Sequence, residues 1–199
     1  MLNKDVVILL FLVMVAVMVS GCIFGTTPLD KVSTHLIQAT DALEELDLIE
    51  GRTNTYILDE ELWMIDQIFF EMEEILPEDE KNYARLQAYR VWTEALGSAS
   101  AIMKGEYDTY KRHLGKAVQY YDQFNYVEWK KEITLAESQV DKMANKAQSA
   151  AYQLDGVSRE DLTDKELIAL QRTRSSMMDI SRQCMALRSN LREENQDRL

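Results

Sequence analysis

The chain of 199 residues contains very few of the residues that interrupt helices, with two prolines and seven glycines. Proteins rich in β-strands need many turns, and proline and glycine are the usual turn residues. Their shortage argues against all-β and α/β folds and favours long, uninterrupted helices. The two cysteines, Cys22 and Cys184, are too few for a disulfide framework. Cys184 falls on an apolar stripe, and we expect it to be a small buried side chain.

Motifs of common catalytic sites are also missing. The two histidines, His35 and His113, stand in no Glu-x-x-His or His-Glu-x-x-His sequence, so di-iron and zinc-protease sites lack their ligands. The chain has no Gly-x-Ser-x-Gly turn and no Gly-rich phosphate loop. The acidic run from Glu71 to Glu80 lacks the loop residues that arrange calcium ligands. We therefore expect no enzyme activity, no cofactor and no metal site.

Basic residues are scarce in the first third of the chain. Between Asp30 and Lys81, sixteen acidic residues stand against three basic ones, a net charge of −13, whereas residues 82–199 carry a net charge of +1. A strongly acidic surface repels nucleic acid. We expect no nucleic-acid binding, and we expect the acidic face of the first two helices to attract a basic partner.

The first 22 residues have the features of an export signal. Residues 6–19 form an apolar run of 14 residues, which is the length of a signal-peptide core and short for a membrane span. The run ends in Val19-Ser20-Gly21-Cys22, which resembles the lipobox of prokaryotic lipoproteins. The resemblance implies that Cys22 receives diacylglycerol and becomes the first residue after cleavage. Two acyl chains give stable membrane anchoring.

These features predict that the chain has three parts. Residues 1–21 would be a cleaved signal peptide, residues 22–28 a lipidated cysteine with a short linker, and residues 29–199 a single helical domain. The alternative is an uncleaved membrane span over residues 6–24, because Asp5 weakens the positive start that Lys4 provides. Both interpretations place the domain outside the cytoplasm and attached to the membrane.

The domain itself predicts an all-α fold. Apolar residues recur at steps of three and four through six segments, which are separated at Gly51, Pro77, Gly105, Asn125 and Gly156. Short connections make sequential helices antiparallel neighbours. We expect about six amphipathic helices in an antiparallel bundle or helical-hairpin array, the second of them the most buried. Thr27-Pro28 opens the first helix, and Ser158-x-x-Asp161 and Thr163-x-x-Glu166 are alternative capping boxes before the last.

One short segment suggests a repeat. Gly105-Glu106-Tyr107-Asp108, followed by Leu114 and Ala117, resembles the middle of a tetratricopeptide repeat, in which the glycine and tyrosine form the turn between two helices. The resemblance covers residues 105–117 only. No second copy follows at the period of 34 residues, and repeat folds need at least three units. No family is recognised for the main domain as a whole.

Aromatic residues are concentrated between Tyr107 and Trp129. Aromatic side chains with a polar tip are frequent where a protein meets a partner or ligand. We predict an interaction or scaffold lipoprotein that contacts another envelope protein through this region. The alternatives are a bundle that binds a small ligand and a tetratricopeptide-like adaptor. The candidate contact residues are Trp92, Tyr107, Tyr110, Tyr120, Tyr121 and Trp129.

Overall fold

The computed structural model describes residues 27–73 and 80–197, and it confirms the all-α fold. A short π-helical segment, η1, lies between two of the α-helices. Within the described residues no β-strand is present, apart from a single isolated bridge between Asp47 and Arg52. The elements are α2 Pro28–Glu44, α3 Tyr56–Glu73, α4 Glu80–Ala101, η1 Ile102–Tyr107, α5 Asp108–Asp122, α6 Tyr126–Asp155 and α7 Asp164–Asp197.

The predicted helix break at Gly105 is wrong. α4, η1 and α5 follow one another directly, so the described chain forms five helical rods rather than six. The apolar stripes on either side of Gly105 end at Ile102 and begin at Tyr107, five residues later. A π-turn pairs residues five apart, so it brings both onto one buried face. The turn implied by the tetratricopeptide-like stretch is therefore not formed.

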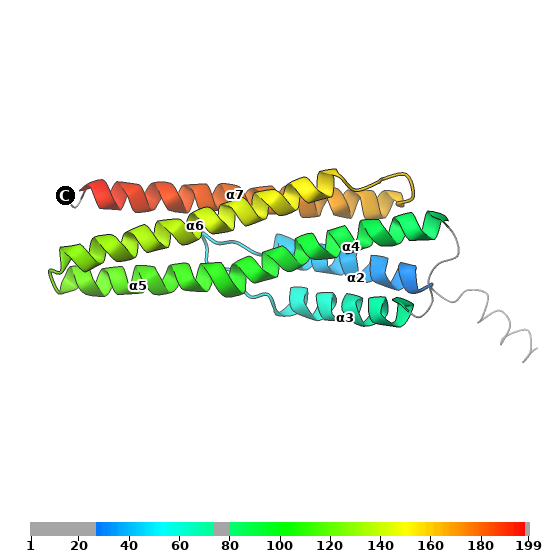
Figure 1. The fold of residues 1–199 in the computed structure, drawn as a ribbon, viewed down its shortest axis with the longest axis horizontal. Coiled ribbons are helices and arrows are strands. Elements are labelled where there is room, and N and C mark those ends of the chain that lie inside the picture. Colours follow the sequence, from blue (N-terminus) through cyan, green and yellow to red (C-terminus); the bar gives the residue numbers. More distant parts are fainter. Residues whose placement is uncertain (1–26, 74–79, 198–199) are drawn as a thin grey trace, which may run out of the picture.

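Three long rods set the shape of the molecule. The α4–η1–α5 rod covers 43 residues, which at about 1.5 Å per residue gives a length of about 65 Å. α6 and α7 run antiparallel to each other along this rod (Figure 1). α2 and α3 are shorter and lie beside only one half of the long rods (Figure 1). The molecule thus has a broad end, where α2, α4 and α7 begin, and a slender end, where α5 turns into α6.

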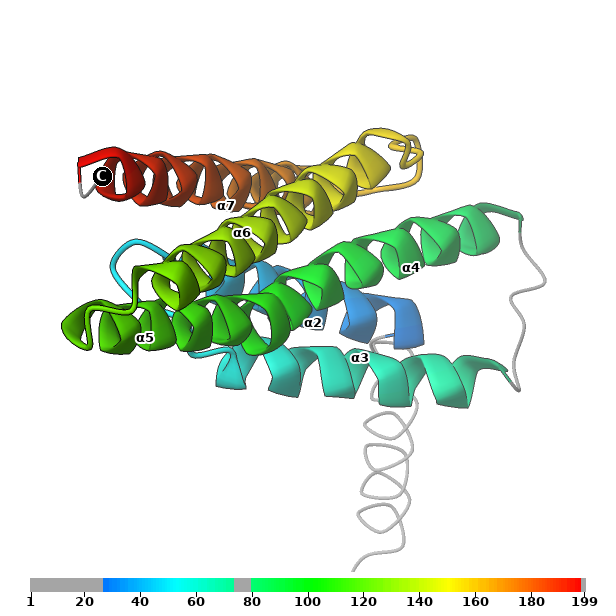
Figure 2. The same cartoon turned by 60° about the vertical axis from the view of Figure 1, so that its left-hand side comes forward.

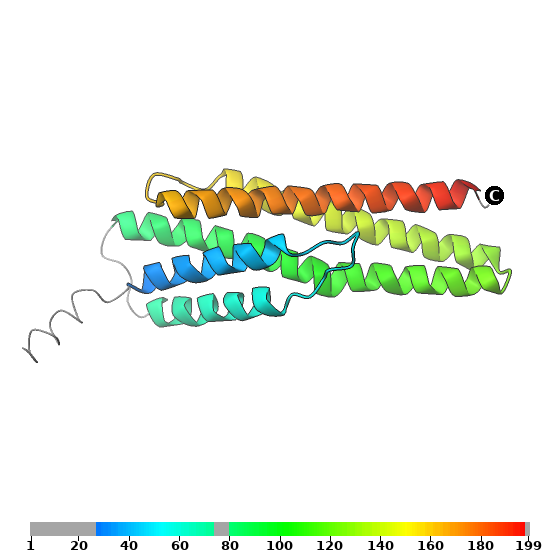
Figure 3. The same ribbon diagram turned by 180° about the vertical axis from the view of Figure 1, so that it is seen from behind.

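Residues 45–55 connect α2 to α3 and extend past both helices along the long rods (Figure 3). The first helix therefore ends before Gly51, where it was predicted to end. The backbone N–H of Leu48 donates to the side chain of Gln183 in α7 (2.8 Å), and its carbonyl accepts from the Tyr107 hydroxyl (2.9 Å). Gly51 has a φ of 72°, a conformation that favours glycine. The segment fills the space between α7 and η1.

Capping side chains set the starts of α2 and α7. Thr27 and Asp30 form a reciprocal capping box at α2, with both hydrogen bonds at 3.2 Å, and Pro28 occupies the first turn. Before α7, the Thr163–Glu166 box is the one that forms, and the Thr163 N–H donates to Glu166 Oε2 at 2.7 Å. The predicted starts of both helices are confirmed.

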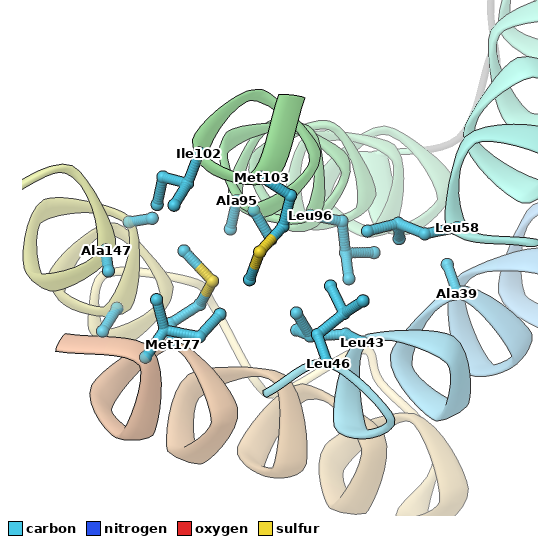
Figure 4. Packing of buried hydrophobic residues seen from close by; sticks show 14 of the residues in the cluster. Ala39, Leu43, Leu46, Leu58, Ala95, Leu96, Ile102, Met103, Ala147 and Met177 are labelled. Atoms are coloured by element: carbon cyan, nitrogen blue, oxygen red, sulfur yellow. The ribbon is translucent and has the colours of Figure 1, made fainter. Parts of the chain in front are cut away.

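The apolar stripes meet in one continuous core. Figure 4 shows Leu96 and Met103 of the central rod pointing toward the side chains of the neighbouring helices, with Met103 close to Met177 of α7. On α6, the apolar residues that recur at steps of three and four from Trp129 to Leu154 are all buried. Cys184 is fully buried and unpaired, as predicted, and burial raises the pKa of its thiol to about 12.

α3 is an edge helix, so the prediction that the second helix is the most buried is wrong. It packs on α2 and α4. Figure 2 shows α3 along one edge of the molecule. Its predicted stripe faces the core through Leu58, Ile65 and Met72. Its opposite face carries large apolar side chains that remain exposed.

Candidate interaction surface

The six aromatic residues predicted to contact a partner or ligand do not form one site. They occupy three places along the long axis of the molecule. From the broad end to the slender end these are Trp92 in α4, then Tyr107 and Tyr110 where η1 meets α5, then Tyr120, Tyr121 and Trp129 beside the α5–α6 turn.

Trp92 belongs to the core. Its side chain is fully buried, and its Nε1–H donates to Thr173 Oγ1 at 2.8 Å. Thr173 also shares a hydrogen bond of 2.7 Å with Thr40 of α2. These buried hydroxyls satisfy the indole and join α2, α4 and α7, so Trp92 holds the broad end together.

Tyr107 and Tyr110 are also buried, and their ring centroids lie 5.7 Å apart. Burial raises the pKa of Tyr107, whose hydroxyl is already committed to the carbonyl of Leu48. A ligand site among these rings would need the rings to line an open cavity, whereas both side chains are buried in the packed core. A hollow of about 190 Å³ lies elsewhere, between α6 and α7, and is lined by Leu154, Leu170 and Arg174 among others.

Tyr121 and Trp129 meet at the slender end. The Tyr121 ring packs edge-on against Trp129 at 6.0 Å and against Tyr126 at 5.8 Å between centroids. Trp129 is buried, whereas Tyr120 and Tyr121 are half-buried. This small aromatic cluster fixes the angle at which α5 turns into α6.

The exposed side chains at this end belong to residues that the sequence analysis did not include among its candidates. We define the tip as residues 123–127. Phe124 and Val127 are each 78% exposed, and Tyr126 is about half exposed. Singly exposed apolar residues are ordinary on protein surfaces. Three of them on one short turn at the end of a long molecule form a compact apolar protrusion.

Phe124 also has an unusual backbone. Its φ is 55°, in the left-handed region that glycine prefers at the residue after a helix. A non-glycine residue there costs about 1 kcal/mol or more. The Phe124 N–H donates to the Tyr121 carbonyl at 2.9 Å, and the Asn125 side chain accepts from Glu128 N–H at 3.4 Å. The stop of α5 and the cap of α6 together leave the Phe124 side chain exposed, although Phe124 continues the three-and-four spacing of Ala117 and Tyr121.

A buried polar contact joins the two helices that carry the tip. His113 Nδ1 of α5 lies 2.5 Å from Glu132 Oε2 of α6, and Glu132 is buried. A short hydrogen bond between two side chains on neighbouring helices limits their relative movement. The tip is therefore carried on a braced pair of helices.

The broad end contains a buried carboxylate, Glu166, at the start of α7. Its Oε1 accepts hydrogen bonds from Ser33 (2.5 Å), from Arg85 (2.6 Å) and from the Tyr89 hydroxyl. Burial on its own raises the pKa of Glu166, but these hydrogen bonds outweigh burial and lower the pKa to about 2. Burial, and after it the hydrogen bond to Glu166, raise the pKa of Tyr89. The cluster joins α2, α4 and α7 and acts as a structural clamp.

Several predicted features lie outside the described residues. These include the apolar run, Cys22 and most of the acidic run from Glu71 to Glu80. Among residues 27–73 and 80–197, no group of three or more His, Cys, Asp or Glu side chains is placed to hold a metal ion. None of the helices described is long and apolar enough to cross a membrane.

Comparison with known proteins adds no family to these observations. No family model, no curated protein and no solved structure matches the chain.

Proposed function

We propose that the protein is a membrane-tethered extracytoplasmic lipoprotein whose helical domain is an interaction scaffold, and that the tip contacts another envelope protein. The observation that carries this proposal is Phe124. Its ring is exposed on a strained backbone, so it stabilises the fold neither by burial nor by a relaxed conformation. Strained residues that give no stability are concentrated where proteins bind.

The geometry of the chain supports this role. α2 begins at Pro28, at the end of the molecule farthest from the tip (Figure 1). Only five residues separate Cys22 from Pro28, and the chain from Cys22 to Pro28 reaches at most about 20 Å. With lipid on Cys22, the broad end would stay near the headgroups and the rods would hold the tip about 65 Å from it.

The chemistry of the tip favours a partner with an apolar pocket. Phe124, Tyr126 and Val127 offer two rings and a branched side chain with little conformational freedom to lose on binding. Asp122, Glu128 and Lys130 around them carry both signs of charge. Contact through the tip would therefore depend on burial of apolar surface more than on charge.

Photo-crosslinking from the tip tests the proposal. A photoreactive amino acid would replace Val127 in the full-length chain in its native membranes. A matched probe would replace Ile168, which is also exposed but lies near the start of α7 at the broad end. We expect one defined protein to be crosslinked from position 127 and not from position 168.

The Phe124→Gly variant distinguishes a role of Phe124 in partner contact from a role in the stability of the fold. Glycine relieves the left-handed backbone, so thermal unfolding should occur at the same or a higher temperature than in the natural chain. The crosslink from position 127 should nevertheless be lost. A crosslink that persists undiminished in Phe124→Gly, or equal capture from position 168, would contradict the proposal.

A further inference from the structure

α3 carries two rows of apolar side chains with the same spacing on opposite faces. Leu58, Ile65 and Met72 recur every seven residues and are buried. Tyr56, Trp63 and Phe70 also recur every seven residues, and they are 70%, 58% and 71% exposed. At 3.6 residues per turn, positions 56, 63 and 70 lie within about 40° of one another and nearly opposite the buried row. We call Tyr56, Trp63 and Phe70 the outer aromatic row.

Nothing in the described part of the chain covers the outer aromatic row. α3 packs on α2 and α4 through its other face and lies at the edge of the molecule (Figure 2). Leaving a large aromatic side chain in water forgoes roughly 1.5–3 kcal/mol of burial. Three rings in line along about 20 Å of one helix form an extended apolar surface rather than scattered exposure.

The charged residues of α3 itself all have one sign. α3 contains six acidic residues and no basic residue. Asp59 pairs with Lys104 at 2.6 Å, and Glu61 contacts His35 at 2.6 Å. Glu60, Asp66 and Glu71 are exposed beside the row, and no ion pair joins them to any other described residue.

We propose that the outer aromatic row binds an amphipathic helix of another protein, one that has Lys or Arg on both sides of its apolar stripe. A repeat of seven residues is the spacing at which two helices pack along each other. Basic side chains on that helix would face Glu60, Asp66 and Glu71, and would gain attraction from their charge. This site is separate from the tip and does not depend on contact through it.

The same charges argue against other occupants. A second copy of the chain would place Glu60, Asp66 and Glu71 against their own counterparts, and like charges across an interface are unfavourable. An anionic membrane surface would be repelled for the same reason. An extended peptide would not match the seven-residue spacing of the rings.

Fluorescence emission from Trp63 can report binding to the outer aromatic row. The chain has three tryptophans, and Trp92 and Trp129 are buried, so changes in emission on binding should come from Trp63. The probe is a synthetic helical peptide with Leu at heptad a and d positions and Lys on the flanks, added to the full-length chain in neutral detergent. A peptide with Glu in place of every Lys is the charge control.

We expect the Lys peptide to shift Trp63 emission to shorter wavelength and to bind at least about tenfold more tightly than the Glu peptide. Tyr56→Ser/Phe70→Ser should weaken binding of the Lys peptide by about tenfold or more while Trp63 still reports. Tyr152→Ser/Ile168→Ser removes two exposed apolar side chains from α6 and α7 and should leave binding unchanged. Asp66→Lys/Glu71→Lys should reverse the preference between the two peptides.

Several results would overturn the proposal. Equal binding of both peptides, no response to the Lys peptide, or full binding by Tyr56→Ser/Phe70→Ser would each do so. A Trp63 shift with phosphatidylglycerol vesicles that exceeds the shift with the Lys peptide would assign the row to a membrane surface. Dimerisation that Tyr56→Ser/Phe70→Ser abolishes would assign it to a second copy. Crosslinking from position 127 should be unaffected by these variants. A negative result for the outer aromatic row would therefore not decide the role of the tip.

Discussion

At the scale of single residues, Glu166 performs two structural roles with one carboxylate. Oε2 caps the start of α7 through the Thr163 N–H, while Oε1 accepts from side chains on α2 and α4. A buried charge is costly unless it is fully hydrogen-bonded. Glu166 meets that condition through Ser33, Tyr89 and Arg85, which explains why a carboxylate that is 1% exposed remains ionised.

The stability of the protein should depend on pH through Glu166. Its pKa is about 2 in the folded chain and 4.5 when unperturbed, so the unfolded state binds its proton more readily. Its contribution is therefore complete above about pH 4.5 and is lost as the pH falls toward 2. The shift corresponds to about 3 kcal/mol. Urea unfolding measured from pH 7 to pH 2.5 should show this loss.

Glu166→Gln is the variant that isolates the effect. It removes the charge and should lower the free energy of unfolding by about 3 kcal/mol at pH 7, with a flatter dependence between pH 4.5 and 2.5. Glu160→Gln changes an exposed carboxylate on the nearby loop and should alter stability by less than about 0.5 kcal/mol. Equal pH profiles for the natural chain and Glu166→Gln would refute this account of the clamp.

At the scale of the elements, Gly105 tests the continuity of the long rod. Gly105 lies in η1 with ordinary helical surroundings, and nothing lies within 4 Å of an added Cβ. Gly105→Ala should therefore raise the free energy of unfolding by about 0.5–1 kcal/mol. Gly51, with a φ of 72°, is the matched control, and Gly51→Ala should lower it by about 1 kcal/mol. If Gly105→Ala destabilised the protein, position 105 would be a turn.

The elements also show which features the sequence could predict. The starts of α2 and α7 depend on local spacing. Thr27-Pro28 was predicted to open the first helix and does so, and of the two alternative capping boxes before the last helix the Thr163–Glu166 box forms. Apolar spacing does not reveal how many neighbours a helix has, so α3 was expected in the centre although one face stays exposed. The continuous helix through Gly105 needed a π-turn, which a search for steps of three and four does not find.

The sequence indicates the region of the tip but not its exposed side chains. Composition located the aromatic cluster near Tyr121 and Trp129, but these rings face each other and the core. The exposed side chains, Phe124 and Val127, depend on where α5 stops and on the backbone that follows. That conformation is set by capping at Asn125 together with the packing of both helices, and it could not be derived from residue spacing.

At the scale of the whole molecule, the fold is elongated, with one broad and one slender end. The Glu166 clamp stabilises the broad end, and the rods carry the tip to the other end (Figure 1). The outer aromatic row runs along one side of the broad half (Figure 2). In the account proposed here, lipid on Cys22 determines the orientation, because it would place one end at the membrane and the other away from it.

Intact mass of protein extracted from membranes tests this account most directly. The lipoprotein proposal predicts a chain that begins at residue 22 and carries additional mass from lipid. In a Cys22→Ala variant that additional mass should be lost. The variant should keep its helical content and its thermal unfolding temperature, because Cys22 lies outside the helical domain. An unmodified chain that still begins at Met1, or lipid mass retained in Cys22→Ala, would contradict the account.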